Sequence, residues 1–394
     1  MSALEGLRIL DMTQYEAGTS CTQALAWMGA DVVKVEPPGT GDPGRGPDGS
    51  AEYFVVWNSN KRSIAIDLRS DEGRDLLLKM LPQYDVFVEN YGPGVVEKLN
   101  IGYDVMKAIK PDIIYARLKG FGTSGPWSDY KCYDMVAQAA AGAFSITGEA
   151  EGPPMRPGPT MGDAGTGVQL ALAITAAWAQ KLRTGRGQLI ELAMQEAMTY
   201  YLRTSTSGTN YGERAASRSG NGQLPTMSLY QSAGGGPNDY VYVMAVTPRM
   251  WESLCVAIDR ADLLTDPRFE TPQSRFENRK ELKSVIEEWT KSRDKYEAMR
   301  ILSEGGVPAS AVLDTSDLYQ NPHLLERGFV HEVEHAEKGK VTLLGWPARM
   351  SESNVEIKAA PILGQHSSEV LTEDLHLSSE DLDRLIDQGI VGQS

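Results

Sequence analysis

The first 200 residues alternate between short apolar strands and helices, and this alternation constrains the fold more than any other feature. Residues 7–11 and 31–36 have the pattern of buried strands, and residues 21–29 between them that of a short helix. The same alternation continues in the strand patterns 63–68, 84–89, 112–118 and 188–193 and the helix patterns 71–81, 95–99, 103–110, 133–144 and 165–181. Repeated strand–helix–strand units predict an α/β fold, with a parallel sheet covered by helices on both faces.

A change in composition near residue 204 predicts a second, smaller domain. Residues 204–225 are rich in Ser, Thr, Gly and Arg, which is typical of a linker. A strand pattern at 240–246 and helix patterns at 250–258, 278–290 and 294–304 follow, and the chain ends with an acidic helix at 379–388. We therefore expect a large domain, 1–200 and 315–394, interrupted by a small α/β domain with its return linker, 226–314.

Charge and composition restrict the classes of partner. The chain has 38 Lys and Arg against 53 Asp and Glu, a formal net charge of −15, which disfavours nucleic acid and anionic membranes as partners. Three scattered cysteines form neither a disulfide framework nor a zinc motif, as expected for a cytoplasmic protein. We find no signal-peptide pattern at residues 1–10 and no apolar run of membrane-spanning length.

A glycine pattern after the second predicted strand suggests a dinucleotide site. Gly39, Gly41 and Gly44 match G-x-G-x-x-G, and Glu36 at the end of that strand could hold a ribose hydroxyl or could be a surface carboxylate at a strand end. However, Pro43 interrupts the pattern and no helix pattern opens after it, so the segment is better interpreted as a turn-rich loop. An NAD-dependent oxidoreductase is therefore a disfavoured alternative.

The histidines give no metal or charge-relay motif. All five follow residue 322, so a Ser-His-Asp or Cys-His arrangement in the N-terminal sheet would need its histidine from the C-terminal segment, and the chain has no G-x-S-x-G motif. His331 and His335 are four residues apart, but the nearby Gly339 predicts a strand and turn there rather than a helix face that could bind zinc. We expect no metal site.

Asp163 is a candidate nucleophile. It lies in the Gly-rich segment 161–167 just before an apolar helix, where backbone amides favour an anion and Gly162 lets a substrate approach closely. An aspartate at this place is also a common helix cap, so spacing alone leaves both interpretations open. Basic residues near the predicted strand ends could neutralise phosphates, or could be solvated surface charges: Arg62, Arg69, Lys98, Lys119 and Lys131.

Eight segments, in order along nearly the whole chain, together resemble the family III CoA-transferases, the formyl-CoA transferase and carnitine CoA-transferase group. They are EAGTSCTQ (16–23), GADVVKVE (29–36), NSNKRS (58–63), VENYGPG (88–94), KGFG (119–122), GDAGTG (162–167), TGRGQ (184–188) and APILGQH (360–366). The resemblance implies a Rossmann-like large domain interrupted by a small one, and two chains threaded through each other as an interlocked homodimer.

The resemblance also implies the chemistry. The substrates would be an acyl-CoA and a free carboxylic acid, with the coenzyme A thioester as substrate and no permanently bound cofactor. Asp163 matches the family's catalytic aspartate, which forms a mixed anhydride and then an aspartyl-CoA thioester. The amides beside it, that of Gly162 included, would stabilise the oxyanions. Racemisation, as in the related α-methylacyl-CoA racemases, is an alternative, but Tyr133 replaces their histidine base; a catalytically silent CoA-binding protein is another.

Further site residues follow from matching positions. Those that would contact CoA or the other substrate are Gln14, Ala17, Leu68, Arg69, Asn90, Tyr91, Lys98, Lys131 and Tyr133, and Gly220 and Gly222 would belong to a gate loop, with 234–236 as the alternative gate. Glu16 would lie near the nucleophile. Gln14 and Glu16 replace a His and a Gln of formyl-CoA transferases, and Pro37 replaces an Arg. Because a carboxylate at position 16 would repel a small dianion, the resemblance leaves the identity of the acid open.

Overall fold

The chain forms two compact units in a computed structural model that describes residues 2–222 and 224–394. The large unit comprises Met1–Phe144, Arg156–Arg214 and Glu326–Ser394, and the small unit comprises Ser145–Met155 and Ala215–Leu325.

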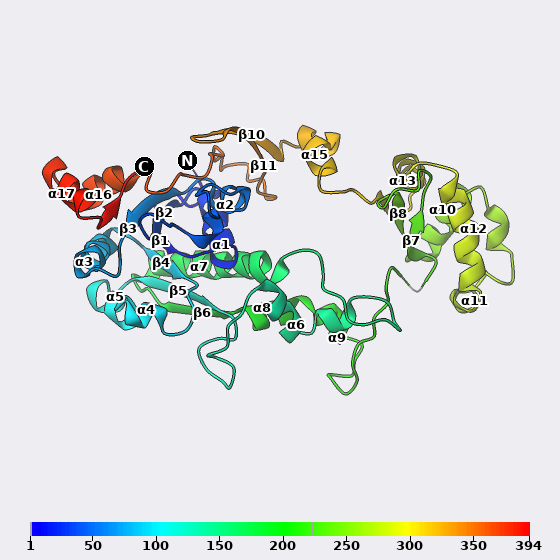
Figure 1. Ribbon diagram of the computed structural model, residues 1–394. Coiled ribbons are helices and arrows are strands. Elements are labelled where there is room, and N and C mark those ends of the chain that lie inside the picture. Colours follow the sequence, from blue (N-terminus) through cyan, green and yellow to red (C-terminus); the bar gives the residue numbers. More distant parts are fainter. Residues whose placement is uncertain (1, 223) are drawn as a thin grey trace. The chain divides into compact units, whose positions relative to one another are not determined.

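A seven-stranded sheet in the order β12-β3-β2-β1-β4-β5-β6 forms the centre of the large unit (Figure 1). Its strands are β1 (Arg8–Met12), β2 (Asp31–Glu36), β3 (Arg62–Ile66), β4 (Val86–Glu89), β5 (Ile114–Lys119), β6 (Leu189–Ala193) and β12 (Val391–Gly392). All neighbours are parallel except β12, which pairs antiparallel with β3. The order 3-2-1-4-5-6 is that of the doubly wound dinucleotide-binding folds.

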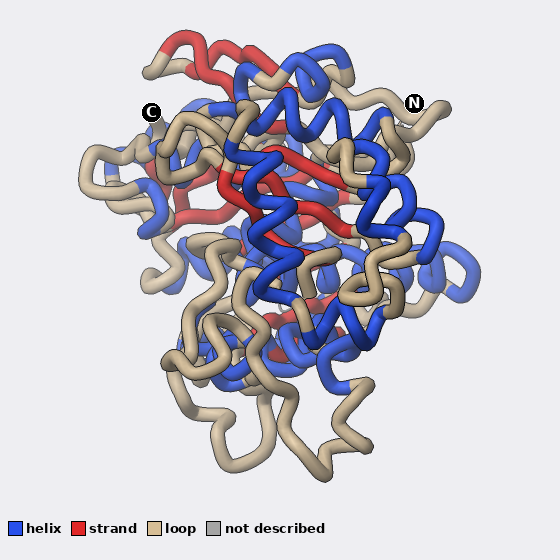
Figure 2. The backbone as a smooth tube through the Cα atoms, turned by 90° about the vertical axis from the view of Figure 1, so that its right-hand side faces the viewer, coloured by secondary structure: helices blue, strands red, loops and turns tan. Residues whose placement is uncertain are grey.

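Helices cover both faces of this sheet, which explains why its strands are apolar on successive residues (Figure 2). Leu10, Val33 and Phe87 face one core, shared with α3, α5, α16 and α17, whereas Ile9, Val32 and Val86 face the other, shared with α1 and α7. The helices of the large unit are α1 (Ala17–Ala26), α2 (Glu52–Asn58), α3 (Asp71–Met80), α4 (Val95–Lys98), α5 (Tyr103–Ile109), α6 (Asp134–Ala140), α7 (Thr166–Thr184), α8 (Met194–Tyr201), α9 (Arg203–Thr206), α16 (Ser367–Leu375) and α17 (Ser379–Asp387).

The small unit has its own core. Its three-stranded antiparallel sheet has the order β7-β8-β9 and packs against helices through residues such as Tyr230, Trp251 and Leu302. Its elements are β7 (Met227–Gln231), β8 (Tyr240–Met244), β9 (Ala309–Ala311), α10 (Pro248–Ala257), α11 (Pro272–Glu277), α12 (Arg279–Lys291), α13 (Lys295–Glu304) and α14 (Asp317–Gln320). Next come α15 (Pro322–Glu326) and, in the large unit, the hairpin β10 (Val330–His335)–β11 (Gly339–Leu344).

The predicted α/β class is confirmed, and the differences lie in single elements. The helix expected at 21–29 begins four residues earlier, at Ala17, because all ten residues of α1 are buried and packing overrides the weak helix propensity of Gly18, Thr19 and Ser20. The elements that were not predicted include α2, α8, α11, α16, β7, β9 and β12. The small unit also takes in Ser145–Met155, a segment inside the predicted large domain 1–200; the Gly220 amide donates to the Gly148 carbonyl at 2.9 Å there.

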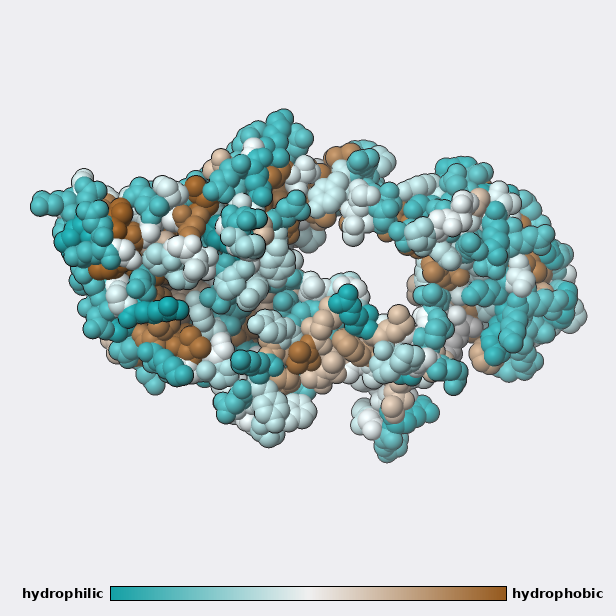
Figure 3. All heavy atoms as spheres, in the orientation of Figure 1, coloured by the Kyte–Doolittle hydropathy of each residue, from teal (hydrophilic) through white to brown (hydrophobic). Residues whose placement is uncertain are grey.

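The surface of the large unit is mainly hydrophilic on the face that Figure 3 shows, with hydrophobic residues gathered near α6, whose Val136 is exposed. Among the described residues, no helix has both the length and the apolar character needed to cross a membrane.

Candidate active site

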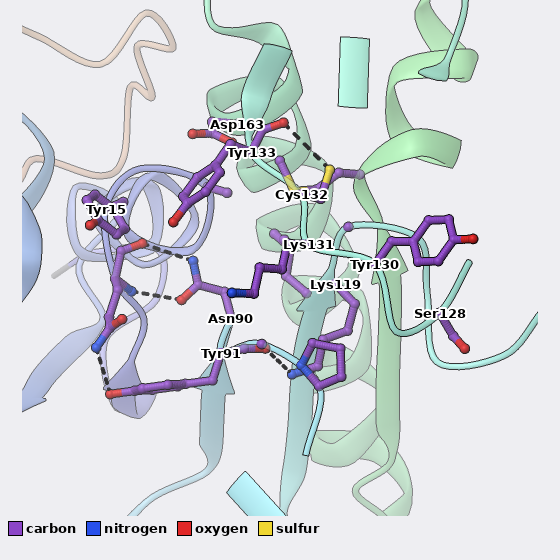
Figure 4. A pocket seen from close by; sticks show the side chains of 17 residues that line it. Tyr15, Asn90, Tyr91, Lys119, Ser128, Tyr130, Lys131, Cys132, Tyr133 and Asp163 are labelled. Carbon is purple, nitrogen blue, oxygen red and sulfur yellow. Dashed lines mark hydrogen bonds between the residues drawn. The ribbon is translucent and has the colours of Figure 1, made fainter. Parts of the chain in front are cut away.

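The candidate site lies where the chain order of the sheet reverses. The connections from β1 and β4 leave the sheet in opposite directions, and in open α/β sheets the crevice beyond the carboxyl ends of such strands is the usual ligand site. A cavity of about 270 Å³ opens here (Figure 4). It is lined by Gln14, Tyr15, Ala17, Asn90, Tyr91, Gly92, Pro93, Leu118, Lys119, Gly120, Ser128, Tyr130, Lys131, Cys132, Tyr133, Asp163 and Met194.

The loop between β1 and α1 forms one wall of this cavity and is fixed to the loop after β4. The side-chain amide of Asn90 accepts a hydrogen bond from the Gln14 backbone N–H at 2.8 Å and donates one to the Gln14 carbonyl at 2.9 Å. The Gln14 side chain in turn donates from Nε2 to the hydroxyl of Tyr91 at 3.0 Å. The Asn90 side chain therefore pairs with the Gln14 backbone as a neighbouring strand would, and connects the loops that follow β1 and β4 (Figure 4).

Asp163 enters the cavity from a single π-helical turn, Met161–Gly165, that leads directly into α7. Gly162 is needed at this turn because a Cβ there would lie 2.7 Å from the backbone oxygen of Asp134. Gly167, one turn further, lets α7 contact α1, since a Cβ at this position would lie 2.5 Å from the Ala17 carbonyl oxygen. The glycines flanking Asp163 thus serve close packing, as well as leaving the carboxyl group accessible.

Three carboxyl groups gather around this turn. The Asp134 carboxylate accepts the backbone N–H of Asp163 at 3.1 Å, and buried Glu16 accepts hydrogen bonds from the hydroxyl of Thr160 and, at 3.2 Å, from that of Tyr53. Burial, followed by the charges of Glu16 and Asp134, raises the pKa of Asp163 to about 7. Burial likewise raises the pKa of Glu16. Asp163 is therefore a carboxylate of unusually high basicity that is still charged in part at neutral pH.

The cations at the cavity differ in what they are free to bind. Lys119 donates to the buried carboxylate of Glu89 at 2.8 Å and to the Tyr91 carbonyl at 2.6 Å, so its charge is already compensated. Lys131 is exposed on the segment that also brings Cys132 and Tyr133 to the cavity. Burial raises the pKa of the Cys132 thiol to about 11, which keeps this thiol neutral. Lys131 is thus the lining cation best placed to meet a phosphate.

The structure brings most of the predicted site residues together. Seven of them line the cavity: Gln14, Ala17, Asn90, Tyr91, Lys131, Tyr133 and Asp163. Two more are next to lining residues in the sequence, because Glu16 lies between Tyr15 and Ala17 and Gly162 directly precedes Asp163. Leu68, Arg69 and Lys98 are outside the lining: Leu68 packs on the core of the large unit, and Arg69 and Lys98 are exposed. Gly220 and Gly222 belong to the small unit.

Two residues that the sequence suggested as ligand contacts, Glu36 and Arg62, have structural roles instead. Glu36, considered as a ribose ligand, is buried and accepts two hydrogen bonds from Arg45, at 2.6 and 2.7 Å, and one from Ser63 at 2.7 Å. The segment Gly39–Gly44 leads into the short 3-10 helix Pro43–Arg45 rather than an α-helix, as expected. Arg62, considered as a phosphate ligand, pairs with Asp31, Glu369 and Glu373.

Sequence reasoning missed Tyr15 and Asp134. Asp134 binds a residue 29 positions away, a distance at which sequence spacing carries no signal, and Tyr15 was unremarkable as a residue between two matched positions. Among the described residues, no cluster of His, Cys, Asp and Glu is arranged to hold a metal ion.

Comparisons with known proteins identify the family. Residues 4–367 match the family model described as CoA-transferase family III. The chain is 38% identical to a formyl-CoA:oxalate CoA-transferase of Streptomyces avermitilis and 39% identical to that of Streptomyces coelicolor, in both cases over 99% of either chain.

Solved structures agree with this match. A CAIB/BAIF family protein from Brucella suis superposes with a TM-score of 0.85 at 30% identity, over 95% of this chain and 99% of the other. Rv3272 from Mycobacterium tuberculosis gives a TM-score of 0.80 at 29% identity, over 93% and 98%. The chain belongs to CoA-transferase family III.

Proposed function

We propose that this enzyme transfers CoA from an acyl-CoA to a free carboxylic acid, with Asp163 as the covalent nucleophile. The observation that carries the proposal is that Asp163 is the one residue with a carboxyl group among the seventeen that line the cavity. Its basicity, with a pKa raised to about 7, suits a nucleophile that must attack a thioester.

The proposed steps conserve the energy of the thioester. The Asp163 carboxylate attacks the thioester carbonyl, the C–S bond breaks, and an acyl-aspartyl anhydride and CoA thiolate form. The thiolate then attacks the aspartyl carbonyl of the anhydride, which releases the donor acid and leaves an aspartyl-CoA thioester. The acceptor carboxylate repeats both steps in reverse order, so that a new acyl-CoA leaves and Asp163 is free again.

Neighbouring groups support these steps. The turn that holds Asp163 begins a helix, whose N-terminal amides favour the oxyanions that form at the aspartyl carbonyl. Lys131 would bind a phosphate of CoA, and the loops that contain Gln14, Asn90 and Tyr91 would line the path of the pantetheine arm. We also propose that Gly220 and Gly222 belong to a gate loop of the active site.

The names of the Streptomyces relatives support small acids as substrates. Oxalate itself is a less suitable acceptor for this enzyme. The buried carboxyl group of Glu16 lies near the nucleophile and would repel the second negative charge of a dianion. We therefore propose a small monocarboxylic acid as acceptor. We also propose that two chains form an interlocked homodimer in the cytoplasm. Exposed apolar residues on α6 and α7, Val136, Val168 and Leu172, support a partner surface on the large unit.

The test is intact-protein mass spectrometry after incubation with a panel of acyl-CoAs, followed by hydroxylamine trapping and peptide mapping. An acyl or CoA adduct on Asp163, and neither adduct nor transfer in Asp163→Ala, is the expected result. Transfer that persists in Asp163→Ala would contradict the proposal. Exchange of the α-proton with deuterated water, without adduct or transfer, would instead indicate a racemase, and CoA binding without either reaction a silent binding protein.

A further inference from the structure

The glycine segment Gly39–Gly44, which binds no dinucleotide in the proposed reaction, carries a buried carboxylate that reaches the cavity wall. Asp42 is 2% exposed. Its Oδ1 accepts the backbone N–H of Tyr15 at 3.0 Å and that of Gly44 at 2.8 Å, and its Oδ2 lies 2.8 Å from Nζ of Lys34. One side chain therefore links the segment after β2 to the loop after β1.

The residue that Asp42 holds has an unfavourable backbone conformation. Tyr15 has φ +58°, in the left-handed region that costs a residue with a Cβ about 1–2 kcal/mol. Its neighbours are fixed as well: Lys34 donates to the Thr13 carbonyl at 2.7 Å, and Asn90 holds the Gln14 backbone. Such a conformation persists only where the surroundings determine it, and the Asp42 carboxylate supplies the hydrogen bond to the Tyr15 amide itself.

Asp42 is itself held rigidly. Its backbone N–H donates to Glu36 at 2.9 Å, and Glu36 accepts two hydrogen bonds from the buried guanidinium of Arg45. This guanidinium stacks 3.6 Å from the ring centre of Phe54. Gly41, at φ +63°, lets the chain turn over the Arg45 side chain, which a Cβ would approach to 2.6 Å. The glycines of the segment thus build a support instead of a phosphate cradle.

The conformation of Tyr15 decides where its ring lies. The rings of Tyr15 and Tyr133 meet edge to face with 6.1 Å between their centres, and both line the cavity with Asp163 (Figure 4). We propose that Asp42 is a positioning residue for CoA transfer, which holds Tyr15 in the left-handed conformation so that the Tyr15–Tyr133 pair forms the wall beside the nucleophile. This inference rests on the proposed function only in taking the cavity as the site of transfer.

A double-mutant cycle tests the proposal. We compare Asp42→Ala, Tyr15→Ala and the double variant by kcat/KM of CoA transfer, by the dissociation constant of CoA from calorimetry, and by urea denaturation. In the wild-type background, Asp42→Ala should lower kcat/KM about 5- to 30-fold, the population factor that corresponds to the cost of the left-handed residue. In the Tyr15→Ala background the further loss should be less than about twofold, whereas the loss of stability should be similar in both backgrounds.

An equal loss of kcat/KM in both backgrounds would overturn the proposal, because Asp42 would then act independently of the Tyr15 ring. Asp48, which is exposed and follows the segment by four residues, gives the control variant Asp48→Ala, which should leave kcat/KM unchanged. If Asp42→Ala does not fold, Asp42→Asn takes its place. It keeps an acceptor oxygen for the Tyr15 amide, so kcat/KM should stay within about twofold of the wild type, and a larger loss of equal size in both backgrounds would overturn the proposal. If Asp163 forms no adduct in the wild type, the proposed function fails separately, and the cycle is read from the dissociation constant of CoA.

Discussion

Replacing Asp163 by asparagine should make the protein more stable at neutral and alkaline pH, although it removes the proposed nucleophile. Folding moves the pKa of this carboxyl group from an ordinary value of 3.8 to about 7, because burial and the charges of Glu16 and Asp134 disfavour its ionised form. Between these two values the folded state binds more protons than the unfolded state, so stability falls as the pH rises. Asparagine carries no charge and escapes this loss.

The expected magnitude follows from the same two values. Each pKa step corresponds to 1.36 kcal/mol, so Asp163→Asn should be more stable than the wild type by at most about 4 kcal/mol at pH 8. At pH 4.5 the difference should shrink to about 1 kcal/mol, because this pH lies only slightly above the ordinary value of 3.8 that the group has in the unfolded chain, so the proton bound in the folded state costs little there. The sign agrees with the general finding that active sites are strained for function at the expense of stability.

Urea denaturation followed by circular dichroism, at fixed protein concentration and at pH values from 4.5 to 8, measures this difference. The control is Asp75→Asn, an exposed aspartate on α3, for which the difference from wild type should stay near zero at every pH. Equal stability of Asp163→Asn and wild type at pH 8, or a difference that does not grow with pH, would refute the placement of Asp163 among buried like charges.

Three further predictions concern activity and packing. The kcat/KM of transfer should fall about tenfold per pH unit below pH 7, because only ionised Asp163 attacks. Glu16→Gln should move this decline to lower pH, since it removes a charge that raises the pKa of Asp163, and a decline that does not move would contradict the coupling of the two carboxyl groups. Lys131→Ala should weaken CoA binding about tenfold in calorimetry, with a smaller effect at high salt, and an unchanged dissociation constant would remove Lys131 from the site. Gly167→Ala should destabilise the fold by about 2 kcal/mol or more in urea despite its better helix propensity, because the Cβ would lie 2.5 Å from the α1 backbone, whereas Gly102→Ala, with no atom closer than 3.9 Å, should have little effect.

The fold class could be predicted because it depends on local patterns. Strands such as Asp31–Glu36 are bounded by Gly and Pro and read clearly, and so do their helical connections. The strand order could not be read in this way, and neither could β12, two residues that form a strand only by pairing with β3. α1 begins where burial requires it, not where propensity favours it.

In the candidate site, too, local sequence signals could be predicted and contacts between distant residues could not. Asp163 stood out because its glycine neighbours are adjacent in the sequence, and the resemblance gave it a role. The partners of the charged residues could not be inferred from spacing. The sequence left a phosphate-binding role open for Lys119, whereas the structure shows its ion pair with Glu89. Asp42 belonged to a motif that suggested a nucleotide, and only its contact with the Tyr15 amide shows what the segment supports.

The interruption of the large unit by the small one has a consequence for the order in which the chain folds. One of the two cores beneath the sheet is completed by Val370, Leu371, Leu385 and Val391, which follow the small unit in the sequence. During synthesis from the N-terminus, the outer edge of β3 therefore stays unpaired and this core stays open while the small unit, continuous apart from Ser145–Met155, is already being made. We therefore expect the large unit to be the later of the two to become resistant to proteases on the ribosome, and its exposed strand edge to be where premature association between nascent chains begins.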